Sequence, residues 1–216
     1  MAQLSIFTSL FSWLPRWMAA SADTAATAAS PTPAAAASPL SQKPVQPETR
    51  IAWGARVSGE FKRKTIAISR RLNMDPSHLM AIMAFETGRS FDPAVSNRAG
   101  SGATGLIQFM PATARGLGTT TGRLAAMDAV DQLDYVEKYL APHAGRMTDL
   151  ASAYMAVLFP RAVDKQPGYV LFRKGSKAYK LNRGLDTDGN GSVTKAEAAA
   201  KVQAVLTEGL RPGLIG

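Results

Sequence analysis

The run Leu79–Phe85, followed by a single glutamate, constrains the fold more than any other feature of this sequence. Asp75 and Pro76 precede the run and form a good helix start, because Asp caps the first turn and the N–H that proline lacks is not needed there. The helix should end at Thr87-Gly88. Because its residues are apolar on almost every side, the sequence predicts a central, buried helix.

The rest of the patterned sequence, which begins near Ile51, is also helical. Apolar residues recur every three or four positions, and further helices are expected to begin at Pro111 and to cover about 124–140, 149–159 and 194–206. The sequence contains no convincing alternating strands and no repeat of solenoid period. A mainly α fold is predicted, with room in 216 residues for one ordinary domain plus appendages.

The first 48 residues differ in composition from the rest. Residues 1–20 hold the apolar stretch Leu4–Leu14, which is too short to span a bilayer as a helix. Three interpretations stay open for it: a signal peptide cleaved near Ala20-Ser21-Ala22, an interfacial membrane contact, or a helix that docks onto a partner protein. Residues 21–48, rich in Ala, Pro, Ser and Thr, are expected to be a linker.

Composition excludes several kinds of chemistry. Cysteine is absent, which excludes thiol nucleophiles and zinc–thiolate sites, and two histidines make a histidine triad or metal cluster improbable. The net charge of +9 favours a polyanionic partner, and residues 50–71 are especially basic. No nucleic-acid motif accompanies this charge, so no nucleic-acid partner is predicted; a solvated helix face explains the basic run equally well.

Glu86 is the candidate catalytic residue. It is the only carboxylate in its apolar helix and lies at the C-terminal end. Desolvation and the negative end of the helix dipole both raise a carboxyl pKa, as a general acid near neutral pH requires. The alternatives are a glutamate that turns outward at the helix end or one that is buried in a salt bridge.

A glycine-rich loop follows, and it carries the candidate substrate-binding residues. Gly102 and Gly105 permit positive φ and close approach of the backbone to a sugar. Gln108 offers both a donor and an acceptor to a saccharide, unless it only braces the loop. Phe109 and Met110 could form an apolar wall against a pyranose ring. Other candidate contacts with substrate are Thr87, Asn97 and Thr104.

The sequence Glu86-Thr87, together with Gly105–Ala114 about twenty residues later, resembles the lytic transglycosylase family of the goose-type lysozyme superfamily. The resemblance covers roughly residues 65–165 and implies a lysozyme-like helical domain that acts on peptidoglycan. It also implies that Tyr154 lies near the catalytic acid. The stretch Ala153–Pro160 departs from the usual Tyr-Asn-Ala-Gly, because Met155 and Val157 replace the asparagine and the glycine. This variant looks like a bacteriophage branch of the family.

The resemblance implies a mechanism with one carboxylate. Glu86 would protonate the glycosidic oxygen of the MurNAc-GlcNAc β-1,4 bond, and would then accept a proton from the muramic 6-hydroxyl as a 1,6-anhydro ring closes. A hydrolytic lysozyme needs a second carboxylate, and Asp92, Asp131 and Asp134 are candidates for it. A wall-binding virion protein without turnover is the alternative from another functional class.

Residues 186–197 match the twelve-residue EF-hand loop. The predicted calcium ligands are Asp186, Asp188, Asn190, Ser192 through its carbonyl, and Glu197. Thr194 and Glu197 also form a capping box for the helix that follows, so part of the pattern is expected of any helix start. A structural Ca²⁺ is predicted; none is expected to act in catalysis.

These observations predict four segments: residues 1–20, the linker 21–48, a catalytic domain at 49–165 and a C-terminal extension at 166–216 with the calcium loop. The resemblance implies peptidoglycan glycan strands as the partner, with other virion proteins contacted through residues 1–20. The expected location is a phage virion acting in the host periplasm; a bacterial periplasmic or secreted enzyme is the alternative.

Overall fold

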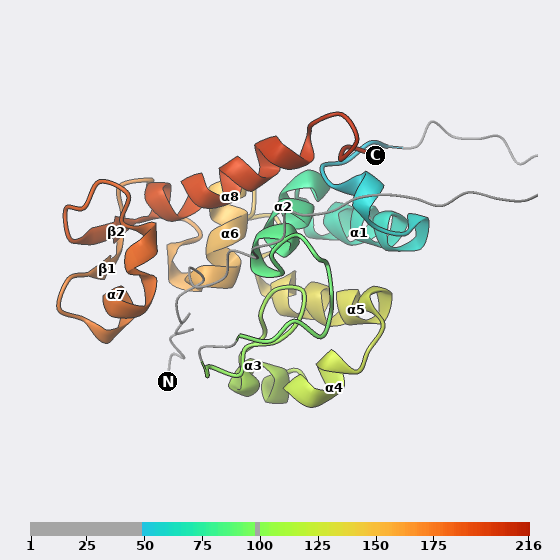
Figure 1. The fold of residues 1–216 in the computed structure, drawn as a ribbon, viewed down its shortest axis with the longest axis horizontal. Coiled ribbons are helices and arrows are strands. Elements are labelled where there is room, and N and C mark those ends of the chain that lie inside the picture. The colour runs from blue at the N-terminus through green and yellow to red at the C-terminus, as the bar shows by residue number, and fades with distance from the viewer. Residues whose placement is uncertain (1–48, 98–99) are drawn as a thin grey trace, which may run out of the picture.

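The computed structural model describes residues 49–97 and 100–216 (Figure 1). The predicted N-terminal segment 1–20 and the predicted linker 21–48 lie outside these residues. The described part is mainly helical, which confirms the predicted fold class. No helix in the described ranges is both long and apolar enough to cross a membrane.

Eight α-helices and two short strands make up the described fold. The helices are α1 Gly59–Leu72, α2 Pro76–Glu86, α3 Pro111–Gly116, α4 Thr121–Ala125, α5 Ala129–Leu140, α6 Leu150–Leu158, α7 Lys177–Asn182 and α8 Lys195–Gly209. The strands are β1 Val170–Arg173 and β2 Ser192–Thr194, and 3₁₀ turns occur at Gly54–Arg56, Ala141–His143, Pro160–Ala162 and Arg183–Leu185.

Helix α2 is the centre of the domain, as its apolar sequence predicted. Asp75 caps it by accepting a hydrogen bond from Ser77 N at 2.7 Å, and Pro76 occupies its first turn. Residues 79–84 are completely buried. Helices α1, α6 and α8 all pack against α2, so the residue that ends it, Glu86, is enclosed by the fold.

The remaining predicted helices are present with shifted bounds. Asp149 caps α6 and Thr194 caps α8, each within a residue of the predicted start. The single helix predicted at 124–140 was wrong: the chain breaks at Met127-Asp128 into α4 and α5. The break occurs because the Asp128 carboxylate accepts from Val130 N at 2.6 Å and starts a new helix.

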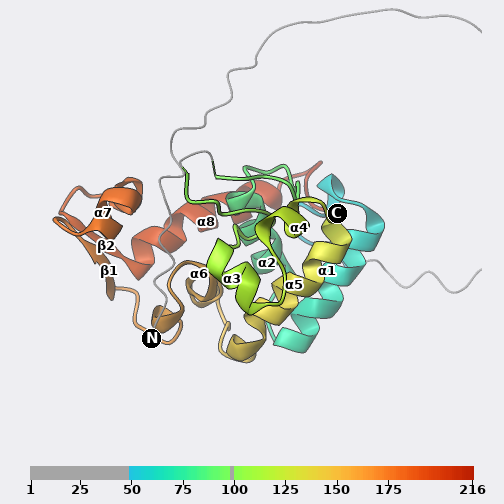
Figure 2. The ribbon, with the colours of Figure 1, turned by 90° about the horizontal axis from the view of Figure 1, so that it is seen from below.

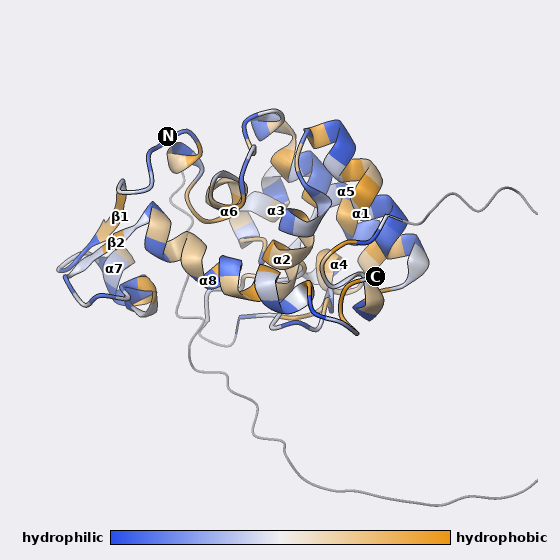
Figure 3. Ribbon diagram, turned by 90° about the horizontal axis from the view of Figure 1, so that it is seen from above, coloured by the Kyte–Doolittle hydropathy of each residue, from blue (hydrophilic) through white to orange (hydrophobic). Residues whose placement is uncertain are grey.

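Figure 2 shows α1 and α5 side by side, at the opposite end of the molecule from α7 and the strand pair. Ion pairs Lys64–Asp134 at 2.7 Å and Arg71–Glu137 at 2.5 Å join these two helices. In Figure 3 both helices carry mixed hydrophilic and hydrophobic residues, as expected of helices with one face in solvent. The basic run 50–71 is therefore partly neutralised by acids of α5.

The strands form a small antiparallel pair that the sequence pattern did not predict. Val170 pairs with Thr194 and Phe172 with Val193, with an irregularity between Val170 and Phe172. Four and three residues long, the strands are too short for a readable alternation. Phe172 and Val193 are nonetheless buried, so the pair anchors the C-terminal lobe of β1, α7 and β2 to the core.

Helix α8 connects this lobe to the helical body (Figure 1). It packs along α6 and α2. Near its end, Trp53 N donates to Gly209 O at 3.0 Å, and the chain end pairs with Ile51 through Ile51 N to Gly216 O at 2.7 Å. The predicted C-terminal extension, 166–216, thus shares one core with the predicted domain at 49–165.

Candidate functional site

Glu86 is buried at the last turn of α2, with 2% of its surface exposed. Neither carboxyl oxygen has a hydrogen-bond partner in the described structure. Ionisation of a buried carboxyl that has no hydrogen bond is energetically unfavourable, because the charge loses its hydration without compensation. Burial accordingly raises the pKa of Glu86 to about 8. At neutral pH the group is a carboxylic acid with a proton to donate.

Two tyrosines lie close enough for the charge of Glu86 to affect them. Tyr154 on α6 is fully buried, its hydroxyl has no partner within the described residues, and its ring meets Phe85 edge-on at 5.6 Å. Tyr139 on α5 donates its hydroxyl to Ala156 O at 3.2 Å. Burial and then the Glu86 charge raise the pKa of Tyr139 to about 12 and that of Tyr154 well above 10. Both phenols stay protonated beside the acid.

Tyr139 is a residue that sequence reasoning missed. It follows Val136 by three residues on the inward face of α5, a spacing typical of an ordinary core aromatic. Only the approach of α5 to the end of α2 distinguishes it, and that approach is a tertiary contact. Its ring packs edge-on against Phe109 at 6.1 Å, which links α5 to the glycine-rich loop.

The glycine-rich loop folds back on itself. Thr104 bridges both Ser96 and Phe109, with Phe109 N donating to Thr104 O at 2.8 Å. Gly105 has φ 88°, and a Cβ there would lie 2.3 Å from Oε1 of Gln132. Glycine at this position therefore permits both the turn and the close approach of Gln132.

Gln132 holds this loop in place, although no motif in the sequence singles it out. Its Oε1 accepts from Leu106 N at 2.7 Å. Its Nε2 donates to Leu124 O at 2.8 Å and to Pro93 O at 3.1 Å. The side chain is fully buried, although the residue before it, Asp131, is exposed.

Three predicted substrate contacts have side chains engaged inside the fold. The Thr87 hydroxyl donates to Met83 O at 2.7 Å and accepts from Phe91 N at 3.1 Å. Gln108 adopts φ 52° and donates through Nε2 to Val95 O and Gly105 O, both at 3.1 Å. The Thr104 hydroxyl donates to Gly102 O at 3.2 Å. These groups brace the loop and the helix end, and their contacts with a saccharide stay predictions.

Gln108, Phe109 and Met110 line one small pocket together with Tyr139 and Val157. Val157 is one of the two departures from the family pattern, so that departure shapes the wall of this pocket. Asn97 is partly buried, and its N–H donates to Ala103 O at 2.8 Å. Its role in substrate binding also stays a prediction.

No second buried carboxylate accompanies Glu86 in the described ranges. Asp92 is exposed and accepts from Ala94 N at 2.8 Å, which is a turn contact. Asp131 and Asp134 are exposed on α5, and Asp134 pairs with Lys64. The site therefore offers one carboxyl with a raised pKa, flanked by two phenols.

The loop 186–197 gathers oxygen atoms that can bind a metal, in the lobe of α7 and the strand pair. Carboxylate oxygens of Asp186, Asp188 and Glu197 lie within 4.8 Å of one another. Gly191 N donates to Asp186 Oδ2 at 2.9 Å and has φ 83°, as the sharp turn of such a loop requires. The other Asp186 oxygen, Oδ1, is buried without a partner in the described structure. An orphaned carboxylate oxygen among oxygen donors fits a hard cation such as Ca²⁺.

Hydrogen bonds within the loop fix the positions of these oxygen atoms. Asn190 Oδ1 accepts from Ser192 N at 2.8 Å. The Glu197 side chain accepts from Thr194 N and from Thr187 N, both at 2.9 Å, which confirms the predicted capping box. Tyr179, which the sequence pattern had not marked as part of the site, donates its hydroxyl to Asp186 Oδ2 at 2.6 Å.

Comparison with known proteins adds to this geometry. Residues 64–157 match the family model described as "Transglycosylase SLT domain", a range that contains Glu86, the glycine-rich loop, Tyr139 and Tyr154. No solved structure matches the chain. The family match supports a transglycosylase SLT domain at residues 64–157, of the lysozyme-like superfamily and with a lytic transglycosylase-type, peptidoglycan-cleaving function.

Proposed function

We propose that this protein is a peptidoglycan lytic transglycosylase in which Glu86 is the only acid and base. The observation that carries the proposal is the buried Glu86 carboxyl, which has no partner in the described structure and a pKa of about 8. A group with this pKa is protonated before the reaction and can act as a base after it has lost its proton.

Two proton transfers complete the reaction. Glu86 donates its proton to the glycosidic oxygen as the bond from that oxygen to the muramic C1 breaks. The muramic 6-hydroxyl then adds to C1 and gives its proton to the Glu86 carboxylate, which closes the 1,6-anhydro ring and restores the acid. No water is consumed. The lack of a second buried carboxylate in the described ranges favours this route over hydrolysis.

Digestion of purified peptidoglycan by the wild type and by Glu86→Gln, read by mass spectrometry, tests the proposal. We expect anhydro-muropeptides, lighter than hydrolysis products by one water of about 18 Da, from the wild type alone. Glu60→Gln is the matched control, because Glu60 is an exposed glutamate on α1. Reducing-end products would establish a lysozyme instead, and absence of cleavage would leave a wall-binding protein.

We propose in addition that the loop 186–197 binds Ca²⁺. Asp186, Asp188, Asn190 and Glu197 would hold the ion through side-chain oxygens and Ser192 through its carbonyl. The clustered carboxylates and the orphaned Asp186 Oδ1 support this assignment. The ion would fix the C-terminal lobe against α8.

Isothermal titration with CaCl₂ tests the calcium proposal. One site per chain is expected in the wild type, and Asp188→Asn should weaken it at least about tenfold. Asp131→Asn, an exposed aspartate on α5, should bind as the wild type does. No saturable heat in the wild type would refute the site.

A phage setting is a further proposal, supported by the phage-type resemblance of Ala153–Pro160. Proteomic analysis of purified virions tests it. Detection of the chain in washed particles would support a virion-associated enzyme delivered to the host periplasm. Its detection only in bacterial periplasm would overturn that setting.

A further inference from the structure

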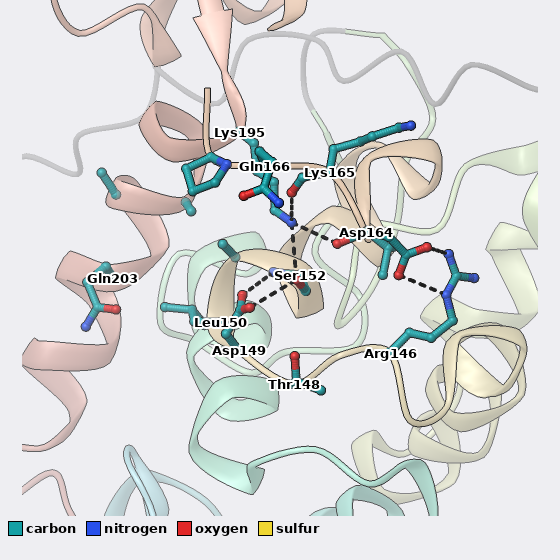
Figure 4. Close-up of a pocket in the computed structure, with 15 residues that line it drawn as sticks. Arg146, Thr148, Asp149, Leu150, Ser152, Asp164, Lys165, Gln166, Lys195 and Gln203 are labelled. Atoms are coloured by element: carbon teal, nitrogen blue, oxygen red, sulfur yellow. Dashed lines mark hydrogen bonds and ion pairs between the residues drawn. The ribbon is translucent and has the colours of Figure 1, made fainter. Parts of the chain in front are cut away.

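A cavity of about 720 Å³ lies away from Glu86, between the first turn of α6, the turn at 163–167 and the first half of α8 (Figure 4). Its lining includes charged, amide and small apolar side chains, and Glu86 is not among them. The volume is within the range of about 300–1,000 Å³ that is typical of sites for small ligands.

Lys195 closes the base of this cavity. It is 4% exposed, and its ammonium group donates to Ser152 Oγ at 3.2 Å and to the carbonyls of Val163 and Lys165 at 2.8 Å each. All three acceptors are uncharged. One side chain thereby ties α8 to α6 and to the turn at 163–167, so the walls are fixed before any ligand binds.

The carboxylates of the cavity are already engaged, as Figure 4 shows. Asp149 accepts from Ser152 N at 2.7 Å and from Ser152 Oγ at 3.2 Å. Asp164 is paired with the Arg146 guanidinium. By contrast, neither Lys165 nor Lys195 forms a salt bridge with a described acid. Because the partners of Asp149 are uncharged, its negative charge counts in the balance: the lining has three cations, Arg146, Lys165 and Lys195, against the two carboxylates. This excess of one positive charge favours an anionic ligand.

The rest of the wall is apolar and small. Ala151, Ala199 and Ala200 contribute methyl groups, and Val163 and Pro167 contribute compact side chains. Gln166 and Gln203 supply amide donors and acceptors at the rim. Small apolar walls with amides and ammonium groups suit a short peptide that carries small side chains and free carboxylates.

We propose that this cavity binds the peptide stem of peptidoglycan. The identity of the peptide rests on the proposed function, since wall stems combine alanine methyl groups with free carboxylates. Ser152 and Tyr154 are two residues apart on α6, so they point to roughly opposite sides of the helix. The stem site is therefore separate from the site of glycan cleavage, and it would hold the enzyme on the wall between cleavage events.

The proposal is tested by isothermal titration calorimetry, which measures the affinity of the full chain for the soluble tetrapeptide L-Ala-γ-D-Glu-L-Lys-D-Ala. Ala200→Trp fills the cavity from an exposed position on α8 and should weaken binding at least about tenfold. Ala204→Trp is the matched control, because Ala204 is exposed on the same helix and does not line the cavity. It should bind within about twofold of the wild type.

The charge requirement has its own test. Lys165→Gln should weaken binding about threefold, and a tetrapeptide with amidated carboxylates should bind at least about tenfold more weakly than the free acid. Equal affinities for the wild type and Ala200→Trp, or no saturable binding by the wild type, would overturn the proposal.

The outcomes separate this proposal from the proposed function. If the wild type cleaves peptidoglycan but does not bind the tetrapeptide, the stem-site proposal is wrong and the proposed function stands. Suppose instead that the wild type binds the tetrapeptide, Ala200→Trp does not, and the wild type cleaves nothing. The proposed enzymatic function would then be wrong, and the stem site would stand as a wall-binding site. Under the proposal, Ala200→Trp still cleaves glycan strands from which the peptides have been removed.

Discussion

The indole Nε1 of Trp53 donates a hydrogen bond to the Val205 carbonyl at 3.0 Å, across 152 positions of sequence. Both residues are buried. The bond joins the first described turn to the last helix, and the indole ring covers Gly209 on the same helix. Besides its packing on α2 and α6, the C-terminal end of α8 is thus held by the fit between one aromatic ring and one glycine.

Gly209→Ala should therefore destabilise the protein by about 2 kcal/mol or more, because an added Cβ would lie 2.3 Å from the Trp53 ring. Urea unfolding followed by tryptophan fluorescence measures the change. Gly116→Ala in α3 is the control: nothing lies within 4 Å of its added Cβ, so its stability should be unchanged or slightly higher. Equal stability of the two variants would contradict the close packing of α8.

The pH dependence of stability should reveal the buried acid. The pKa of Glu86 is about 8 in the folded protein against 4.5 for an ordinary glutamate, so the folded state binds more protons than the unfolded state between these values. The folded protein is more stable with Glu86 protonated than with Glu86 charged. This stabilisation by the protonated form is complete below pH 4.5 and is lost as the pH rises through 8. Glutamine cannot ionise, so the free energy of unfolding of Glu86→Gln should rise relative to that of the wild type by a few kcal/mol across this pH window. Parallel denaturation curves at about pH 5 and about pH 8 measure the difference; a constant difference would mean that Glu86 is solvated.

Activity should fall on the alkaline side for the same reason. General acid catalysis requires the protonated Glu86, so kcat/KM on soluble glycan fragments should decline as the pH rises above about 8. The test is a pH–rate profile between about pH 3.5 and about pH 9.5 with a stability control at each pH. A decline centred near pH 4.5 would show that the carboxyl is hydrated in the free enzyme.

Gln132→Met should weaken the glycine-rich loop. The substitution leaves Leu106 N–H without its acceptor, and the buried Leu124 carbonyl and the partly buried Pro93 carbonyl without their donor. We expect a loss of about 2–4 kcal/mol in stability and a fall in kcat larger than the change in KM, since the loop packs through Phe109 on Tyr139, which lies close enough to Glu86 to respond to its charge. Asp131→Asn, one residue earlier and exposed, should leave both quantities unchanged.

Calcium should raise the melting temperature through the loop 186–197. At a hundredfold excess over Kd, a ligand that binds only the folded state adds about 2.7 kcal/mol. Glu197→Gln should lose this gain. Its metal-free melting temperature should fall by less, because the one carbonyl oxygen of glutamine completes the capping box with Thr194 but leaves Thr187 N without its acceptor. Differential scanning calorimetry with CaCl₂ and with a chelator compares the two proteins. A calcium-dependent shift that persists in Glu197→Gln would place the ion elsewhere.

The features that the sequence predicted well are encoded within a few residues. Asp75-Pro76 and the apolar run after it determine the start and the burial of α2, and the Thr194–Glu197 capping box determines the start of α8. The burial of Glu86 followed from the same local pattern. The split at Asp128 was missed because its cap competes with a helical periodicity that continues on both sides of it.

The features that were missed depend on contacts between distant segments. Tyr139 and Gln132 resemble ordinary residues of α5 until the loop and α2 are placed beside them. Lys195 occupies a position in the loop 186–197 that any exposed residue could fill, yet it is buried by α6 and the turn at 163–167. The periodicity of a single segment cannot predict such contacts, because each one requires a partner from another part of the fold.

The pairing of Ile51 with Gly216 has a consequence for engineering the chain. Residues at the two ends of the described core are hydrogen-bonded neighbours, so a short peptide could join them and new termini could be opened elsewhere. Gly175 is a suitable opening point, because it is exposed in the turn after β1 and a Cβ added there would meet nothing within 4 Å. Such a circular permutant would place β2 and α8 ahead of α1, so the two paired strands would lie near opposite ends of the new sequence.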